Sequence, residues 1–228
     1  MMKKDQNENL KKPRGTEAYE LILNRILAGD IQPGAPIVEA RLAETLGVSR
    51  TPIRQALFKL EQEGFATSSS GSGFSVSPLT EREAREVYPL IAGLEVIAIE
   101  ESGPLLPTIV DKLISLNRKL AEAKNIAAGI QIDSMWHDTL ISCCGNNRLQ
   151  SWVSTLRCTV YRYETYYMSD TALIAESVKQ HAKLIELLRD ARQDELALEL
   201  KRHYKFGMEA VVLKLTAESA AIAAGKLH

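Results

Sequence analysis

Three features that would place this chain of 228 residues in a membrane or secreted class are missing from it. No run of about 18 apolar residues occurs, so a membrane-spanning helix is not expected. The polar N-terminus lacks the apolar segment of a secretory signal. The cysteines Cys143, Cys144 and Cys158 have no CxxC spacing, which argues against a disulfide framework and indicates a reducing compartment. We therefore expect a cytoplasmic protein with no membrane partner.

An excess of positive charge is also missing. The formal net charge is −1, and residues 15–77 contain five Lys and Arg against seven Asp and Glu. Only residues 1–14 are basic, with five Lys and Arg against two Asp and Glu, which predicts a flexible basic arm. Any binding of nucleic acid must therefore depend on where individual basic residues lie rather than on a basic domain.

The hydrophobic pattern changes at residues 78–79, which we interpret as a linker. Residues 15–77 show short helical patterns at about 16–28, 39–46 and 50–63, then two strands at 65–67 and 74–76 around a Gly/Ser-rich loop. Residues 80–228 are almost entirely helical in period, with helices expected at about 80–102, 105–127, 130–144, 147–168, 170–191 and 193–223. A capping box of Thr80 and Glu83 marks the first of them. The predicted fold is mainly α: an N-terminal winged helix-turn-helix with a small β-hairpin wing, then an all-helical antiparallel bundle.

The helix expected at 50–63 has a polar N-terminal end suited to DNA. A tight Gly47-Val48 turn precedes it, and its first two turns carry Ser49, Arg50, Thr51, Arg54 and Gln55. Arg50 and Arg54 share a face, and arginine binds guanine or phosphate, while hydroxyls and N-terminal amides suit phosphate. In a winged helix-turn-helix this end enters the major groove, and the wing loop that ends at Gly73 would reach the minor groove. The alternative is a helical hairpin with solvated arginines, and spacing alone does not decide between the two.

Residues 47–57, GVSRTPIRQAL, followed by Leu60-Glu61 and Glu63-Gly64, resemble the recognition-helix signature of GntR-family bacterial transcription regulators. Residues 73–76, GFSV, resemble the wing strand of that family. The resemblance implies contacts of Arg50 and Arg54 with double-stranded operator DNA, supported by Ser49, Thr51 and Gly73. A further DNA-contacting arginine of some members is replaced here by Ala40, with Arg41 beside it.

Four polar residues fall on the inward faces of three expected helices: Asp133, His137, His181 and His203. Asp133 and His137 are four residues apart and project to the same side of their helix. Each could be a separately satisfied core residue, but four such burials would each cost about 1–3 kcal/mol if poorly partnered. A single divalent ion would satisfy all four, and this ligand set suits zinc, nickel, manganese or iron.

The segment Asp133-Ser-Met-Trp-His137, with His181 and His203 after it, resembles the metal-site pattern of the FCD ligand-binding domain. That domain belongs to the FadR-type branch of GntR regulators. The resemblance implies a helical bundle that binds a divalent metal and, in many members, a small carboxylate effector. Asn146 matches a polar residue of the family's site. The arginine that clamps the effector in many members is replaced by Ile91, which leaves Arg157 and Arg162 as alternative effector anchors.

We therefore predict a regulator, most simply a repressor, that binds operator DNA as a homodimer and is controlled by an effector, a carboxylate, in a bundle holding zinc, nickel or manganese. A metalloenzyme using the Asp/His₃ site is a second hypothesis, although no HExxH motif or comparable general base accompanies these ligands. A third hypothesis keeps the regulator but fills a metal-free bundle with a larger apolar ligand.

Overall fold

The computed structural model describes residues 14–69, 73–103 and 106–223. Nearly all of the predicted basic arm and the Gly/Ser-rich turn at 70–72 lie outside the described residues. The chain divides into two units, Met1–Pro78 and Leu79–His228. No helix within the described ranges is both long enough and apolar enough to cross a lipid bilayer.

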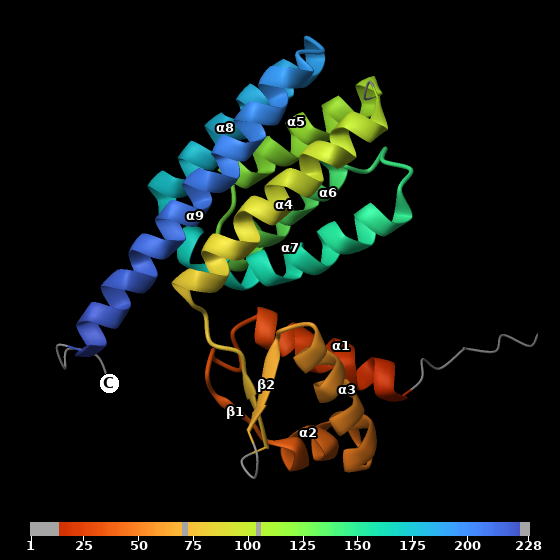
Figure 1. The fold of residues 1–228 in the computed structure, drawn as a ribbon, viewed down its shortest axis with the longest axis vertical. Helices are drawn as coiled ribbons and strands as arrows, with labels where there is room; N and C mark the ends of the chain where they lie inside the picture. The colour runs from red at the N-terminus through yellow and green to blue at the C-terminus, as the bar shows by residue number, and fades with distance from the viewer. Residues whose placement is uncertain (1–13, 70–72, 104–105, 224–228) are drawn as a thin grey trace, which may run out of the picture. The chain divides into compact units, whose positions relative to one another are not determined.

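The N-terminal unit packs short helices against a small sheet (Figure 1). Its elements are α1 (Arg14–Leu27), β1 (Pro36–Ile37), α2 (Glu39–Leu46), α3 (Arg50–Gln62), β2 (Ala66–Ser69) and β3 (Gly73–Val76). Helices α1 and α2 both pack on α3, whose inward face is apolar. Ile22 of α1 and Ile53 and Leu57 of α3 are fully buried there. The predicted winged helix-turn-helix is confirmed.

The wing contains one strand more than the sequence indicates. Strands β2 and β3 form the predicted antiparallel hairpin, with Ala66 opposite Val76. Strand β1 pairs with the other edge of β3, with Pro36 opposite Ser75, so the sheet order is β1-β3-β2. A two-residue strand has no periodicity to detect, and Pro36 is tolerated because it lies in an edge strand.

Gly47 fixes the turn between α2 and α3. It has φ +61°, in the left-handed region that favours glycine. This conformation lets the amide of Val48 bond back to the carbonyl of Ala43 at 3.0 Å, which ends α2 and redirects the chain into α3.

The C-terminal unit is a bundle of α4 (Glu81–Ser102), α5 (Pro107–Ala121), α6 (Ile126–Leu140), α7 (Asn147–Tyr167), α8 (Thr171–Arg189) and α9 (Gln193–Ala223). Helix α4 packs between α7 and α9, and α5 packs between α6 and α8. Contacts of α8 with α9 and of α6 with α7 join these two layers (Figure 1). The mainly helical fold is therefore confirmed, and the core lies between the layers.

The capping box predicted at the start of α4 is half formed. The Thr80 hydroxyl accepts a hydrogen bond from the Glu83 amide at 3.1 Å, as expected. Glu83 does not return to the Thr80 amide. Instead, the Thr80 amide donates to the Tyr163 hydroxyl at 3.1 Å, and that hydroxyl donates to the Glu83 carboxylate. A tyrosine of α7 thus replaces the local partner, which sequence spacing cannot reveal.

Helix α6 is shifted from the predicted range of 130–144. It begins at Ile126 because the Asn125 side chain caps it, accepting a bond from the Ala128 amide at 2.9 Å. Gly129 therefore lies inside the helix rather than before it. A Cβ at this glycine would lie 3.6 Å from the Met168 sulfur, an ordinary van der Waals distance, so the glycine neither breaks the helix nor is required by packing.

We expect Gly47→Ala to destabilise the N-terminal unit by about 1–2 kcal/mol, because an L side chain is strained at this φ. No neighbouring atom lies within 4 Å of the added Cβ, so backbone strain is the cause. Gly93→Ala is the matched control: this glycine is inside α4 and equally uncrowded, so the change should stabilise by up to about 1 kcal/mol. Chemical denaturation followed by circular dichroism measures both, and a shift in the same direction would contradict the assignment.

Candidate functional site

Helix α3 presents its predicted DNA-contacting residues to solvent. Ser49, Arg50, Thr51, Arg54 and Gln55 are all exposed, while the apolar face of the helix is buried. The Arg54 side chain is 58% exposed, and its Nε lies 3.7 Å from a carboxylate oxygen of Glu39. Because exposed ion pairs contribute little, this contact leaves the guanidinium available to another anion.

The N-terminus of α3 has the features of a phosphate site. Ser49 has an extended backbone with φ −70° and ψ 168°, and its side chain makes no capping hydrogen bond. The first amides of a helix have no partner within it, so they and the Ser49 hydroxyl suit a phosphate oxygen. Gly73, at the start of β3, is exposed with φ +78°, and Ala40 and Arg41 are exposed on α2.

The three predicted histidine ligands converge in the middle of the bundle. His137 of α6, His181 of α8 and His203 of α9 each offer a ring nitrogen, and these atoms lie within 4.8 Å of one another. Asp133, one turn before His137, has carboxylate oxygens 3.8 Å from His137 Nε2 and 3.7 Å from His181 Nε2. All four side chains are buried or nearly so. The structure thus brings together residues that are up to 70 positions apart in the sequence.

Hydrogen bonds determine which nitrogens face the centre of this cluster. His137 Nδ1 donates to Glu95 Oε2 at 3.0 Å, and His203 Nδ1 donates to Gln180 Oε1 at 2.8 Å. Their Nε2 atoms, left without protons in these tautomers, face each other at 3.3 Å. Two lone pairs at that distance repel unless a cation lies between them. An outer partner on the second ring nitrogen is also the arrangement that orients a metal-binding histidine.

His181 is held by stacking rather than by hydrogen bonds. Its ring lies parallel to that of Trp136, with the centroids 3.8 Å apart and an interplanar angle of 2°. Both of its ring nitrogens are buried without a hydrogen-bond partner among the described residues. Since buried polar atoms are almost always satisfied, this exception also fits a bound cation.

Burial sets the charge of the cluster. Desolvation lowers the pKa of His137, His181 and His203, so the three rings are neutral near neutral pH and keep the lone pairs that a metal ligand needs. Desolvation also raises the pKa of Asp133, an effect opposed by His137 and by a hydrogen bond from Ser177. The donor set of three imidazoles and one carboxylate fits zinc, nickel or manganese.

A small cavity of about 30 Å³ adjoins the cluster. Its lining consists of Tyr88, Asp133, His137, Val160, Glu164, Tyr167, Met168, Ser177, His203, Tyr204 and Gly207. Glu164 of α7 is buried, and desolvation, with repulsion from Asp133, raises its pKa to about 8. The volume equals roughly the share of one water molecule in the liquid, so the cavity has room for an ion-sized occupant.

None of the predicted effector anchors lines this cavity. Arg157 is buried in an ion pair with Glu95, and its Nε lies 3.2 Å from Asp138 Oδ1. Arg162 is buried with its Nη1 3.9 Å from Glu83 Oε2. Asn146 caps α7, accepting a bond from the Leu149 amide at 3.1 Å. Both arginines are therefore already engaged with carboxylates of the protein.

Sequence reasoning missed Glu95 and Glu164 as site residues. Glu95 is fully buried on α4, four residues after the fully buried Ile91, and Glu164 is four residues after the buried Val160 on α7. The available signal was a single carboxylate at helical spacing within an otherwise apolar stripe. The same signal identified Asp133, but there it was supported by a histidine one turn later.

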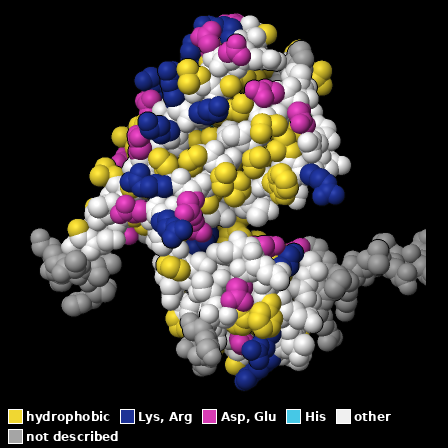
Figure 2. Space-filling model, viewed as in Figure 1, with side chains coloured by type: hydrophobic (Ala, Val, Ile, Leu, Met, Phe, Trp, Pro, Cys, Tyr) yellow, Lys and Arg dark blue, Asp and Glu magenta, His cyan; other side chains and the backbone are white. Residues whose placement is uncertain are grey.

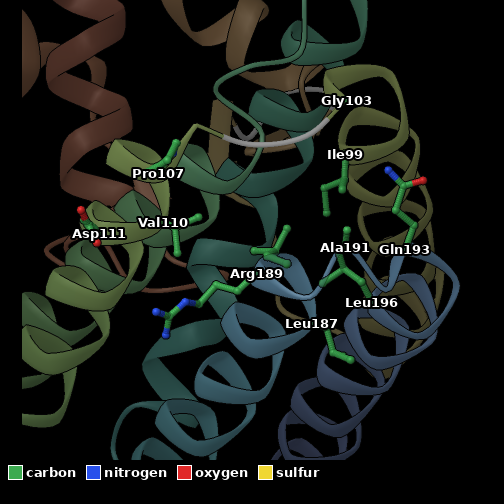
Figure 3. Close-up of a pocket in the computed structure, with 11 residues that line it drawn as sticks. Ile99, Gly103, Pro107, Val110, Asp111, Leu187, Arg189, Ala191, Gln193 and Leu196 are labelled. Atoms are coloured by element: carbon green, nitrogen blue, oxygen red, sulfur yellow. The ribbon is translucent and has the colours of Figure 1, made fainter.

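A second hollow has a volume of about 370 Å³. Figure 3 shows the residues that line it. It is formed by Ile99 and Gly103 at the end of α4, the first turns of α5, and residues 187–196 around the α8–α9 turn. The lining is mostly apolar, with Asp111, Arg189 and Gln193 as its polar members. It contains no histidine, so it is separate from the candidate metal centre.

Comparisons with known families match both units. Residues 14–76 match the model described as bacterial regulatory proteins, gntR family, and residues 86–206 match the FCD domain. The second match alone spans more than half of the chain.

Individual relatives agree with these matches. The chain is 31% identical over 178 residues to the Nta operon transcriptional regulator of Aminobacter aminovorans, covering 75% of this chain and 82% of the relative. It is 30% identical over 121 residues to the gluconate operon transcriptional repressor of Bacillus licheniformis. That match covers 51% of this chain and 49% of the relative. Among solved structures, E. coli McbR/YncC superposes with a TM-score of 0.76 at 19% identity. The superposition covers 90% of this chain and 100% of McbR/YncC, which shows a shared fold.

Proposed function

Because this chain belongs to the GntR family of bacterial regulatory proteins and carries an FCD domain, it is a transcription regulator, and we propose that it represses its target genes. The family also confirms the prediction that the chain is not an enzyme, which removes the metalloenzyme hypothesis. The name of the Bacillus licheniformis relative, a gluconate operon repressor, supports repression as the sign of control. Action on bacterial DNA supports our proposal that the protein is cytoplasmic.

The observation that carries the regulatory site is the close approach of the buried Nε2 atoms of His137 and His203, 3.3 Å apart. With His181 and Asp133 they would hold a divalent ion, for which zinc, nickel and manganese are the candidates. When bound, the ion supplies a positive centre that attracts an anionic or lone-pair-bearing effector. The neutral histidine ligands leave the charge of the ion unchanged, and Asp133 offsets one unit of it.

A carboxylate effector would be anchored by the ion rather than by an arginine. Arg157 and Arg162 are both in contact with carboxylates of the protein, so neither is the primary anchor. Effector binding would change operator affinity through a coupling free energy between two sites, for which about 1–3 kcal/mol is typical.

An exposed apolar strip on α4 supports a homodimer formed through the bundle. Leu90 and Ile97 are seven residues apart on one helix face and are 58% and 42% exposed. Figure 2 shows hydrophobic side chains gathered on this side of the bundle, with charged side chains toward the edges. A two-fold dimer would place two α3 helices on a pseudo-palindromic operator.

The metal proposal predicts one ion per chain in protein purified without chelator, measured by inductively coupled plasma mass spectrometry. The double variant His181→Ala/His203→Ala should lose it because two of the four ligands are gone. Lys183→Ala, an exposed change on the same helix as His181, is the control and should retain the ion. Equal, substoichiometric metal in wild type and the double variant would refute the site.

The DNA proposal predicts that Arg54→Ala weakens binding to a duplex selected from genomic fragments by about 1–3 kcal/mol, or roughly 5- to 150-fold. Fluorescence anisotropy at several salt concentrations measures the loss. Arg118→Ala, an exposed arginine on α5, is the matched control and should bind like the wild type. If Arg54→Ala retains full affinity with an unchanged salt slope, α3 is not the recognition helix.

The dimer proposal predicts that Leu90→Glu/Ile97→Glu converts the protein to a monomer, because the charges would be buried at the interface. Ile126→Glu, at a residue 43% exposed on α6, should leave the dimer intact. Sedimentation equilibrium gives the masses. A double variant that keeps the dimeric mass, or a wild type that is monomeric, would exclude this interface.

A further inference from the structure

Glu164 is a buried carboxylate that the predicted ligand set leaves out. Its side chain belongs to α7, is 7% exposed, and lines the same small cavity as Asp133, His137 and His203. Its Oε2 is buried and has no hydrogen-bond partner among the described residues. A buried carboxylate oxygen without a partner is unfavourable, so its position beside the histidines calls for a cation.

The charge of Arg157 opposes the desolvation that raises the pKa of Glu164, but the contacts of the Arg157 guanidinium are with other carboxylates. Arg157 forms its ion pair with Glu95 and lies close to Asp138. Glu95 also accepts the hydrogen bond of His137. The remaining carboxylates at the cavity are therefore Asp133 and Glu164, and three neutral imidazoles add no charge to them. Two carboxylates compensate one divalent ion.

The size of the cavity also fits a divalent ion. Its volume of about 30 Å³ admits an ion or a water molecule beside the ligands. The position that a carboxylate effector would take at the ion is already lined by a carboxylate of the protein.

We propose that Glu164 is a further protein ligand of the divalent ion, and that it competes with any carboxylate effector for the same coordination position. This inference rests on the proposed metal site and refines its effector chemistry. The donor set becomes three imidazole nitrogens and two carboxylates, which suits an ion that accepts five or six ligands. A carboxylate effector gains access only by displacing Glu164, so wild-type protein binds simple carboxylates weakly.

The test uses full-length protein stripped of metal and titrated with Co²⁺ against a chromophoric chelator. Glu164→Gln should weaken Co²⁺ binding about tenfold or more, as the loss of one site residue typically does. The control Glu209→Gln, at an exposed carboxylate on α9, should bind like the wild type. The visible spectrum of Co²⁺-loaded protein gives a second readout, because the coordination sphere of the variant differs from that of the wild type.

Acetate then tests the competition directly. Added acetate should change the Co²⁺ spectrum of Glu164→Ala and restore part of its Co²⁺ affinity, while leaving the wild-type spectrum unchanged at the same concentration. Thermal melts of the metal-free proteins check folding, and Glu164→Gln, which keeps the size of the side chain, should melt at about the same temperature as the wild type. If Glu164→Gln fails to fold, Glu164→Asp provides the affinity comparison and should bind Co²⁺ more weakly than wild type.

The possible failures are distinguishable. Wild-type protein that is folded but binds no Co²⁺ overturns the metal site and this inference together. Wild type, Glu164→Gln and Glu164→Asp binding Co²⁺ equally, while His181→Ala/His203→Ala does not bind, overturns the role of Glu164 alone. An equal acetate response of wild type and Glu164→Ala overturns the competition.

Discussion

Repulsion between two imidazole lone pairs is the constraint around which the bundle is organised. His137 and His203 come from helices α6 and α9, and their Nε2 atoms meet at 3.3 Å because each Nδ1 is committed to an acceptor outside the cluster. In an apolar core this contact is unfavourable without a cation. It gives roles to the polar groups around it, because Glu95 and Gln180 orient the two rings and Asp133 lies beside them as a candidate ligand.

The partners outside the cluster extend this organisation across the layers. Glu95 of α4 contacts both His137 of α6 and Arg157 of α7. A single carboxylate therefore joins α4, α6 and α7. Tyr204 contributes its hydroxyl, 3.2 Å from His137 Nδ1 and 3.3 Å from Arg157. A buried network of this kind is stable only when every member is satisfied, which makes the geometry of the core sensitive to what occupies the cavity.

Local patterns were sufficient to predict the helices, the wing hairpin and the four inward-facing polar residues. The helical period placed Asp133 and His137 on one face, and the same period placed His181 and His203 toward the core. Long-range partners could not be predicted in this way. Glu95 and Glu164 are isolated carboxylates on their helices, and only packing brings them to the histidines. The shifted start of α6 has a local cause, the Asn125 cap, whereas the close approach of Gly129 to Met168 depends on tertiary structure.

The hydrogen bond between Tyr163 and Thr80 ties the start of α4 to the helix that carries Glu164. Tyr163 holds the first turn of α4, two residues after the N-terminal unit ends at Pro78, and the next residue on α7 is Glu164 at the cavity. Consecutive residues of a helix share one stiff backbone and cannot move independently. A single peptide bond therefore separates the side chain that faces the cavity from the side chain that anchors the exit of the linker.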